Sequence, residues 1–92
     1  MRISVQYTTQ LKAALGIGQE EVSTETNTTL PQLFAQLASS HGSPFIDHVM
    51  DDTGQLRPAI IVCVDDRQVE LSDDVALHDG ATVTLLSAIS GG

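Results

Sequence analysis

Length, composition and charge limit what this chain can be. Its 92 residues suffice for one domain with one hydrophobic core and are too few for two. The 4 Lys plus Arg against 12 Asp plus Glu give a formal net charge of -8 at pH 7, which repels nucleic-acid backbones and anionic lipid surfaces. We therefore expect no nucleic acid and no membrane among its partners, and instead a protein with a basic groove.

The N-terminal quarter predicts two strands joined by a wide hairpin loop. Residues 2–7 alternate polar and apolar side chains, which is typical of a half-buried strand. Residues 8–18 carry apolar side chains at helical spacing, which predicts a turn of helix inside the loop. Residues 20–25 form a weaker, polar strand candidate, and their polarity favours an edge position in the sheet.

A stripe of apolar residues at helical spacing predicts the main helix. The stripe consists of Leu30, Leu33, Phe34, Leu37 and Ala38. Thr29 with Gln32 resembles a capping box, although Thr28 is an alternative cap. Pro31 is tolerated in the first turn, and Gly42 stands where a left-handed residue would end the helix.

A second, short helix is expected directly after the first. Ser43 followed by Pro44 predicts an N-cap and a first helical residue. The short apolar stripe of this helix consists of Ile46, Val49 and Met50. The helix should end before the turn at residues 51–54, and residues 56–58 should be extended because the residue before a proline disfavours the helical region.

The C-terminal third predicts three strands. Residues 59–64 are apolar on both faces and rich in β-branched side chains, which favours a central strand. Asp65-Asp66 turns the chain into a short return strand at residues 67–71. Asp79-Gly80 is a strong turn signal before the last strand at residues 81–86.

This order of elements predicts an α+β roll. It contains a mixed four- to five-stranded sheet, one main helix packed across it and a short second helix. In the β-grasp (ubiquitin-like) version of this layout, the first and last strands lie parallel at the sheet centre, and the helix supplies the crossover between them. We expect residues 1–86 to form a single β-grasp domain and residues 87–92 to form a flexible C-terminal tail.

The two closing glycines carry the functional hypothesis. Gly91 and Gly92 lack a Cβ atom, so this end of the chain is slender and conformationally free. Such an end suits a carboxylate that threads through a narrow channel into the active site of another protein. A frayed terminus is the simpler alternative.

Three stretches of this sequence resemble the ubiquitin-like sulfur carriers of the ThiS/MoaD family. They are the helix start at Thr29-Leu30, the apolar strand that runs into residues 64–66, and the closing block of residues 79–92, which is the specific one. Members usually have a proline near the position of Ser87. The additional segment at residues 43–58 is closest in layout to the molybdopterin synthase small subunit and to the carrier that feeds cysteine synthesis.

The resemblance implies a defined chemistry at the C-terminus. Gly92 would be adenylated by a ubiquitin-activating-type adenylyltransferase that uses ATP and magnesium. A sulfur donor protein would then supply the sulfur of a thiocarboxylate, which passes it to a sulfur-accepting synthase or large subunit. The chain would be a carrier and not an enzyme, and it would bind no cofactor itself. The receiving pathway could be cofactor, cysteine or other sulfur-metabolite biosynthesis.

Two other functions remain open from the sequence. The chain could be a ubiquitin-like modifier that is conjugated through Gly92 to lysines of target proteins. It could also be a plain interaction module whose Gly-Gly end is accidental. Lys12 is its only lysine, which disfavours chains of itself but says nothing about other targets.

Alternation along the last strands predicts a docking surface beside the tail. If Ile60, Val62 and Val64 face the helix, Ile61 and Cys63 project from the opposite face of the sheet. Leu86 then joins that outer face. The predicted partner-docking residues are Ile61, Cys63, Leu86, Ala88 and Ile89.

The remaining candidate residues indicate no second site. Cys63 could carry a persulfide, but it has no cation near it in sequence to lower its pKa, and a packing role is favoured. The single cysteine fits a reducing compartment, and no apolar leader or membrane span is apparent, so we expect a cytoplasmic protein. Six histidine and aspartate residues show neither metal-ligand spacing nor a calcium-loop pattern. We expect them at the solvated surface; they are His41, His48, His78, Asp47, Asp51 and Asp52.

Overall fold

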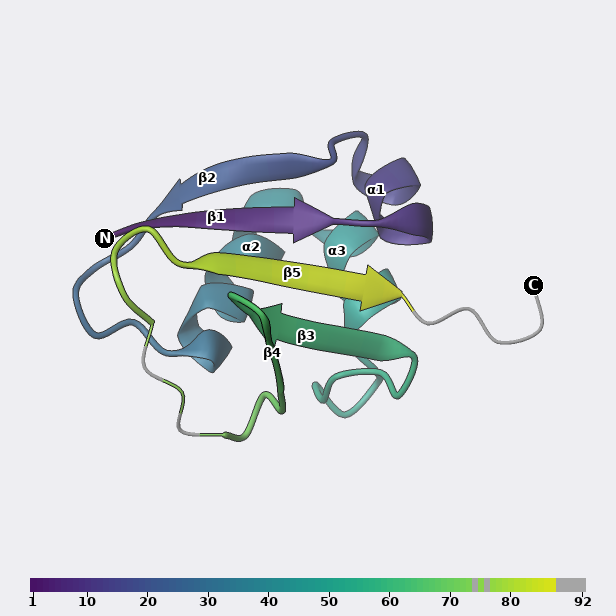
Figure 1. Ribbon diagram of the computed structural model, residues 1–92. Coiled ribbons are helices and arrows are strands. Elements are labelled where there is room, and N and C mark those ends of the chain that lie inside the picture. Colours follow the sequence, from purple (N-terminus) through teal and green to yellow (C-terminus); the bar gives the residue numbers. More distant parts are fainter. Residues whose placement is uncertain (74, 76, 88–92) are drawn as a thin grey trace.

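The computed structural model describes residues 1–73, 75 and 77–87. Figure 1 shows the arrangement of its helices and strands. In chain order these are β1 (Arg2–Tyr7), α1 (Thr9–Leu15), β2 (Gln19–Ser23), α2 (Leu30–His41), α3 (Ser43–Val49), β3 (Ile60–Val64), β4 (Arg67–Val69) and β5 (Thr82–Ser87). The predicted strands and helices are all present, with bounds that differ by one or two residues. No helix in the described part of the chain is long and apolar enough to cross a membrane.

The five strands form one mixed sheet in the order β2-β1-β5-β3-β4. β1 and β5 are parallel at its centre, and every other neighbouring pair is antiparallel. This confirms the predicted parallel pairing of the first and last strands, the edge position of β2 and the internal position of β3. The parallel pair requires a long crossover, which the segment containing α2 and α3 supplies.

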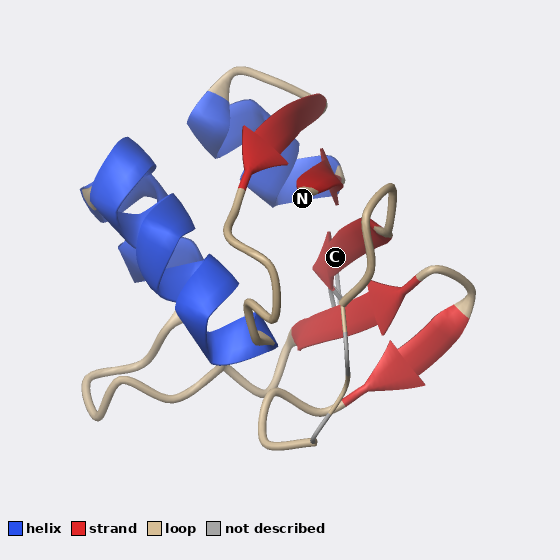
Figure 2. Cartoon of the chain, turned by 90° about the vertical axis from the view of Figure 1, so that its left-hand side faces the viewer, coloured by secondary structure: helices blue, strands red, loops and turns tan. Residues whose placement is uncertain are grey.

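The helices lie on one face of the sheet, and the core lies between the two layers. Figure 2 shows the helices on one side of the strands. Ile3 and Val5 of β1 and Leu33 and Phe34 of α2 are fully buried. The rings of Phe34 and Phe45 meet edge to face, with their centroids 6.0 Å apart. The opposite face of the sheet is left uncovered by helices.

The junction of α2 and α3 differs in part from expectation. The capping box of Thr29 and Gln32 is present. Gly42 has a positive φ of 69° as expected, but its ψ of -143° lies outside the left-handed helical region. The N-cap of α3 is Gly42 and not Ser43. The reason is that Gly42 serves both helices: its N–H donates to the carbonyl of Ala38, and its own carbonyl accepts the first backbone bonds of α3.

The buried stripe of α3 is also different from the predicted one. Phe45 and Val49 are fully buried, whereas Ile46 is 41% exposed, so the expectation that Ile46 faces the core is wrong. The helix begins one residue earlier than predicted, at Ser43. Its inward face falls on Phe45 and Val49, four residues apart, and Phe45 packs against Phe34 of α2.

Candidate functional site

The outer face of the sheet carries a small apolar patch at the end of β5. Ile61 and Cys63 of β3 and Leu86 of β5 are half-buried on the face that no helix covers. Ile61 is the cross-strand partner of Leu86. Ile60, Val62 and Val64, on the alternate positions of β3, are buried. The predicted division of the two faces is confirmed, and we call these three residues, Ile61, Cys63 and Leu86, the outer patch.

On the outer face, the row of residues next to Ile61 and Leu86 contains Cys63 and otherwise only polar, uncharged side chains. Cross-strand pairing places Cys63 beside Thr84 of β5 and Gln68 of β4. Thr84 is in turn paired with Gln6 of β1. The apolar surface is therefore confined to the end of the sheet at which β5 ends, beside Ile60 and Ser87.

The C-terminal residues of the predicted site lie outside the described residues. These are Ala88, Ile89, Gly91 and Gly92. β5 includes Ser87, so the last strand extends one residue beyond the predicted domain. Leu86 of the outer patch is thus separated only by Ser87 from the segment in which the reactive end was predicted.

A polar cluster lies under the sheet at this same end. The Tyr7 hydroxyl donates to Oε2 of Glu20 at 2.5 Å. Nε2 of His41, at the end of α2, lies 2.5 Å from the same oxygen. The His41 ring meets that of Tyr7 edge to face and stacks on that of Phe45. The side chain of His41 is only 18% exposed, so the expectation that it is solvated surface is wrong.

The position of Tyr7 changes its ionisation. Burial raises the pKa of the Tyr7 hydroxyl well above its ordinary value, and the hydrogen bond to the Glu20 carboxylate raises it further. The phenol therefore stays protonated and donates to Glu20. This bond joins β1 to the edge strand β2, while His41 links the same carboxylate to the helical layer.

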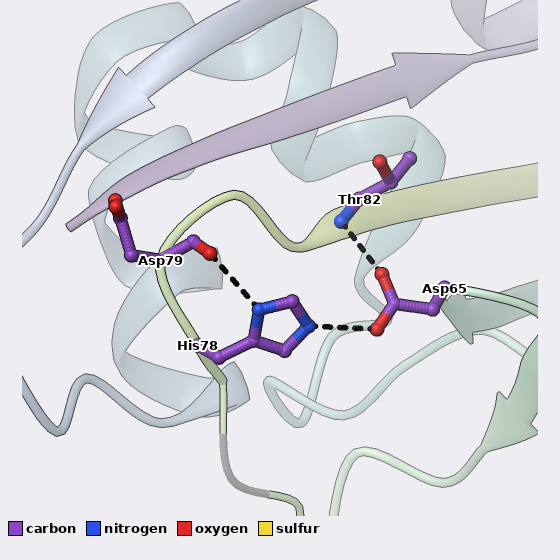
Figure 3. Close-up of polar contacts among 4 residues, drawn as sticks. All are labelled: Asp65, His78, Asp79 and Thr82. Atoms are coloured by element: carbon purple, nitrogen blue, oxygen red, sulfur yellow. Dashed lines mark hydrogen bonds and ion pairs between the residues drawn. The ribbon is translucent and has the colours of Figure 1, made fainter.

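A second polar cluster holds the start of β5, at the opposite end of the strand (Figure 3). Oδ1 of Asp65 accepts the backbone N–H of Thr82, and the Asp65 N–H donates to the Thr82 carbonyl. Nε2 of His78 donates to Oδ2 of Asp65 at 2.9 Å, and Nδ1 of His78 donates to the carbonyl of Asp79 at 2.9 Å. Both ring nitrogens thus face acceptors.

The hydrogen bonds in this cluster favour the protonated form of His78 and the ionised form of Asp65. The bond to Asp65, together with that to the Asp79 carbonyl, raises the pKa of His78 above 6.5. The bond from His78, followed by the bond from the Thr82 backbone, lowers the pKa of Asp65 below 3.8. The ion pair is exposed and fixes the turn between β3 and β4 against the beginning of β5.

Asp51 and His48 also have structural partners. Oδ1 of Asp51 accepts from Thr53 and from the backbone of Gln55, and these bonds lower the pKa of Asp51. Nδ1 of His48 donates to the carbonyl of Pro44 in its own helix. Within the described residues, no group of three or more His, Cys, Asp or Glu side chains could hold a metal ion.

Sequence reasoning missed the two polar clusters because their members are distant along the chain. His41 and Glu20 are 21 residues apart, and His78 and Asp65 are 13 residues apart. No local spacing pattern connects such pairs. The one available signal was that both Asp65 and His78 adjoin predicted turns, and those turns flank neighbouring strands of the sheet.

Comparison with solved structures identifies the fold. SAMP1 from Haloferax volcanii superposes with a TM-score of 0.86 at 22% identity, over 100% of both chains. Urm1 from Trypanosoma brucei gives a TM-score of 0.78 at 28% identity, over 99% of this chain and 95% of that one. A chain of the BexX/CysO complex from Amycolatopsis orientalis gives 0.68 at 28% identity, over 98% and 99%. A search of curated proteins found no match.

The mixed sheet with its central parallel pair and its single helical layer defines a ubiquitin-like β-grasp protein. The model of the ThiS family matches residues 5–92. The chain belongs to the ThiS family, whose members are small carrier and modifier proteins.

Proposed function

We propose that this protein is a sulfur carrier that works through a C-terminal thiocarboxylate at Gly92. The observation that carries the proposal is the match of the ThiS family model through residue 92, so that it includes Gly91 and Gly92. The half-buried outer patch at the end of β5 supports it, because exposed apolar surface commonly marks a protein interface. The protein would present its C-terminus to a partner that performs the chemistry.

Activation by a partner is needed because a carboxylate is a poor electrophile. In the proposed first step, a carboxylate oxygen of Gly92 attacks the α-phosphorus of ATP on a ubiquitin-activating-type enzyme, and pyrophosphate leaves. The enzyme's magnesium ion would neutralise phosphate charge. A sulfur nucleophile at the oxidation level of sulfide then attacks the carbonyl carbon. A C–S bond forms, the C–O bond to AMP breaks, and a proton is released to leave the thiocarboxylate.

The outer patch would guide docking on the activating enzyme or on the protein that receives the sulfur. Ile61 and Leu86 lie one row before the last paired row of β5, which is that of Ile60 and Ser87. A partner that covers this row would therefore also meet the segment that follows Ser87. The net charge of -8 favours a partner with a basic docking surface.

Conjugation to other proteins is the second candidate function. The same acyl adenylate can be attacked by a lysine amine instead of sulfur, and an isopeptide bond then forms as AMP leaves. A protein named small archaeal modifier protein 1, from H. volcanii, has the same fold, with a TM-score of 0.80 at 19% identity. The two functions share the first step and differ in the nucleophile.

An exchange assay tests the shared first step. The protein is incubated with the activating enzyme of its host, ATP, magnesium and labelled pyrophosphate. We expect exchange of label into ATP with the full chain and none with a chain that lacks Gly91 and Gly92. Equal exchange with both chains would contradict the assignment of Gly92 as the activated residue.

A further inference from the structure

Among the described residues, the hydrogen bond that ends the β1–β5 ladder is made by the side chain of Thr8, the residue after β1, and not by the backbone. Near the start of this parallel ladder, the N–H of Ser4 donates to the carbonyl of Ala81 at 2.9 Å. A parallel ladder advances by two residues on each strand, so the same pattern would bring the Thr8 N–H to the carbonyl of Leu85. The structure places the Thr8 hydroxyl on that carbonyl instead, at 3.1 Å.

This use of the hydroxyl carries a local cost. Thr8 is the N-cap of α1, and its carbonyl accepts the first backbone bonds of the helix. A threonine at this position normally caps its own helix with its side chain, yet Thr8 makes no such bond. The next residue, Thr9, has a φ of 47°, which is strained for a β-branched side chain. Two unfavourable features therefore coincide at this junction, and such strain persists where the surrounding structure enforces it.

The end of β5 is paired with fewer strands than the rest of it. Its pairing with β1 ends at Tyr7 and Leu85. Its pairing with β3 continues through Leu86 and Ser87. Figure 1 shows β1 turning away into α1 near the end of β5. The last two described residues of β5 therefore have a strand partner on one side only, directly before the segment that the partner enzyme would receive.

We propose that Thr8 is a positioning residue for the C-terminal segment. Its hydroxyl closes the parallel ladder at Leu85 and thereby holds the end of β5, from which the C-terminal segment continues, on the side of β1. The inference rests on the proposed function, in which an activating enzyme takes up this segment. A strand end that is held on both sides raises the fraction of docked molecules whose C-terminus enters the active site, so loss of the hydroxyl should lower kcat more than it raises KM.

The test compares one substitution that removes the hydroxyl with one that keeps it. Thr8→Val keeps the shape of the side chain and removes the donor, whereas Thr8→Ser keeps the donor. Both are made in a Thr9→Gly background, because glycine accepts the positive φ and should offset any loss of stability. Pyrophosphate exchange is measured as kcat and KM for this protein, and the carbonyl carbon-13 chemical shift of Leu85, the residue whose carbonyl accepts the Thr8 hydroxyl, is measured by NMR.

We expect Thr8→Val to lower kcat about fivefold, the effect of one ordinary hydrogen bond, with little change in KM. The Leu85 carbonyl resonance should move upfield in this variant, because its carbonyl loses a hydrogen bond, and Thr8→Ser should match the Thr9→Gly parent in both measurements. Equal behaviour of the Val and Ser variants would overturn the proposal. If the unsubstituted protein supports no pyrophosphate exchange, the proposed function fails, and the Leu85 carbonyl shift still decides whether the Thr8 hydroxyl closes the ladder.

Discussion

Ile61 and Leu86 are cross-strand partners on the face of the sheet that the helices leave uncovered. Their neighbours Val62 and Leu85 are also paired with each other, but on the buried face. One step along either strand thus separates a core residue from a candidate docking residue. This alternation makes it possible to change the docking surface without entering the core.

Replacing Ile61 with aspartate should weaken partner binding and leave the fold intact. Loss of an apolar contact and introduction of a charge at an interface should reduce affinity about 30-fold, or roughly 2 kcal/mol. Gln68→Asp is the matched control, because Gln68 is exposed on the same face one row away. Binding to the activating enzyme is measured by calorimetry and the fold by circular dichroism. Loss of the native spectrum in Ile61→Asp would show that Ile61 is a core residue.

The His78–Asp65 pair should make stability depend on pH in a limited window. The pKa of His78 is raised, so its contribution is full below its ordinary value of 6.5 and disappears as pH rises through the folded pKa. The pKa of Asp65 is lowered, so its contribution is present above 3.8 and disappears as pH falls through the folded pKa. Substituting His78 with glutamine should therefore lower Tm most between pH 3.8 and 6.5.

The control for this prediction is His48→Gln. His48 is exposed and bonds only the Pro44 carbonyl of its own helix among the described residues. Its substitution should shift Tm little and with no maximum in the same window. A difference between wild type and His78→Gln that stays constant across the pH range would show that the ion pair contributes nothing specific.

Tyr7 should resist ionisation for as long as the protein is folded. It is the only tyrosine, so phenolate absorbance reports on it alone. The folded pKa lies above the unfolded value of 10.0, so the folded state holds the proton more tightly and stability should fall as pH rises past 10.0. We expect phenolate to appear together with the loss of native circular dichroism. Phenolate that forms at an ordinary pKa in the folded protein would contradict the burial and bonding of this hydroxyl.

Cys63 should be dispensable for sulfur chemistry. It is half-buried on the outer face and paired with Thr84 and Gln68. Cys63→Ser should leave the yield of thiocarboxylate unchanged when the protein is supplied with its activating enzyme and sulfur source. Because Cys63 belongs to the outer patch, its substitution should weaken docking slightly, and a modest rise in KM agrees with this prediction. Loss of sulfur incorporation at saturating protein would instead favour the persulfide role.

Much of the fold could be predicted because it follows from local patterns. Alternation in residues 2–7 indicated which side chains face the core, and the structure confirms it. Residues 59–64 are apolar on both faces, and the structure confirms the assumption that Ile60, Val62 and Val64 face the helices. Thr29 and Thr28 were both possible caps of the main helix, and the structure shows the capping box of Thr29. The parallel central pair was expected from the β-grasp version of the layout, in which the segment containing the helix is long enough for the crossover, and the structure confirms it.

The errors and omissions arose where tertiary contacts decide the outcome. Ile46 was assigned to the core because both Phe45 and Ile46 stand at helical spacing from Val49, and only the contact of Phe45 with Phe34 shows which of the two is buried. His41 was assigned to the surface because its partner, Glu20, belongs to a strand that only the fold brings near. The Thr8 hydroxyl was not considered, because its acceptor in Leu85 lies 77 residues further along the chain.

The central claim is that Gly92 carries sulfur as a thiocarboxylate, and intact-mass spectrometry of the protein isolated from its own cells tests it most directly. We predict a species in which one oxygen has been replaced by sulfur, and fragmentation should place that change at Gly92. A chain that lacks Gly91 and Gly92, expressed in the same cells, should show no such species. Gly92 joined to lysines of other proteins, with no sulfur-containing form at any growth stage, would contradict the carrier assignment.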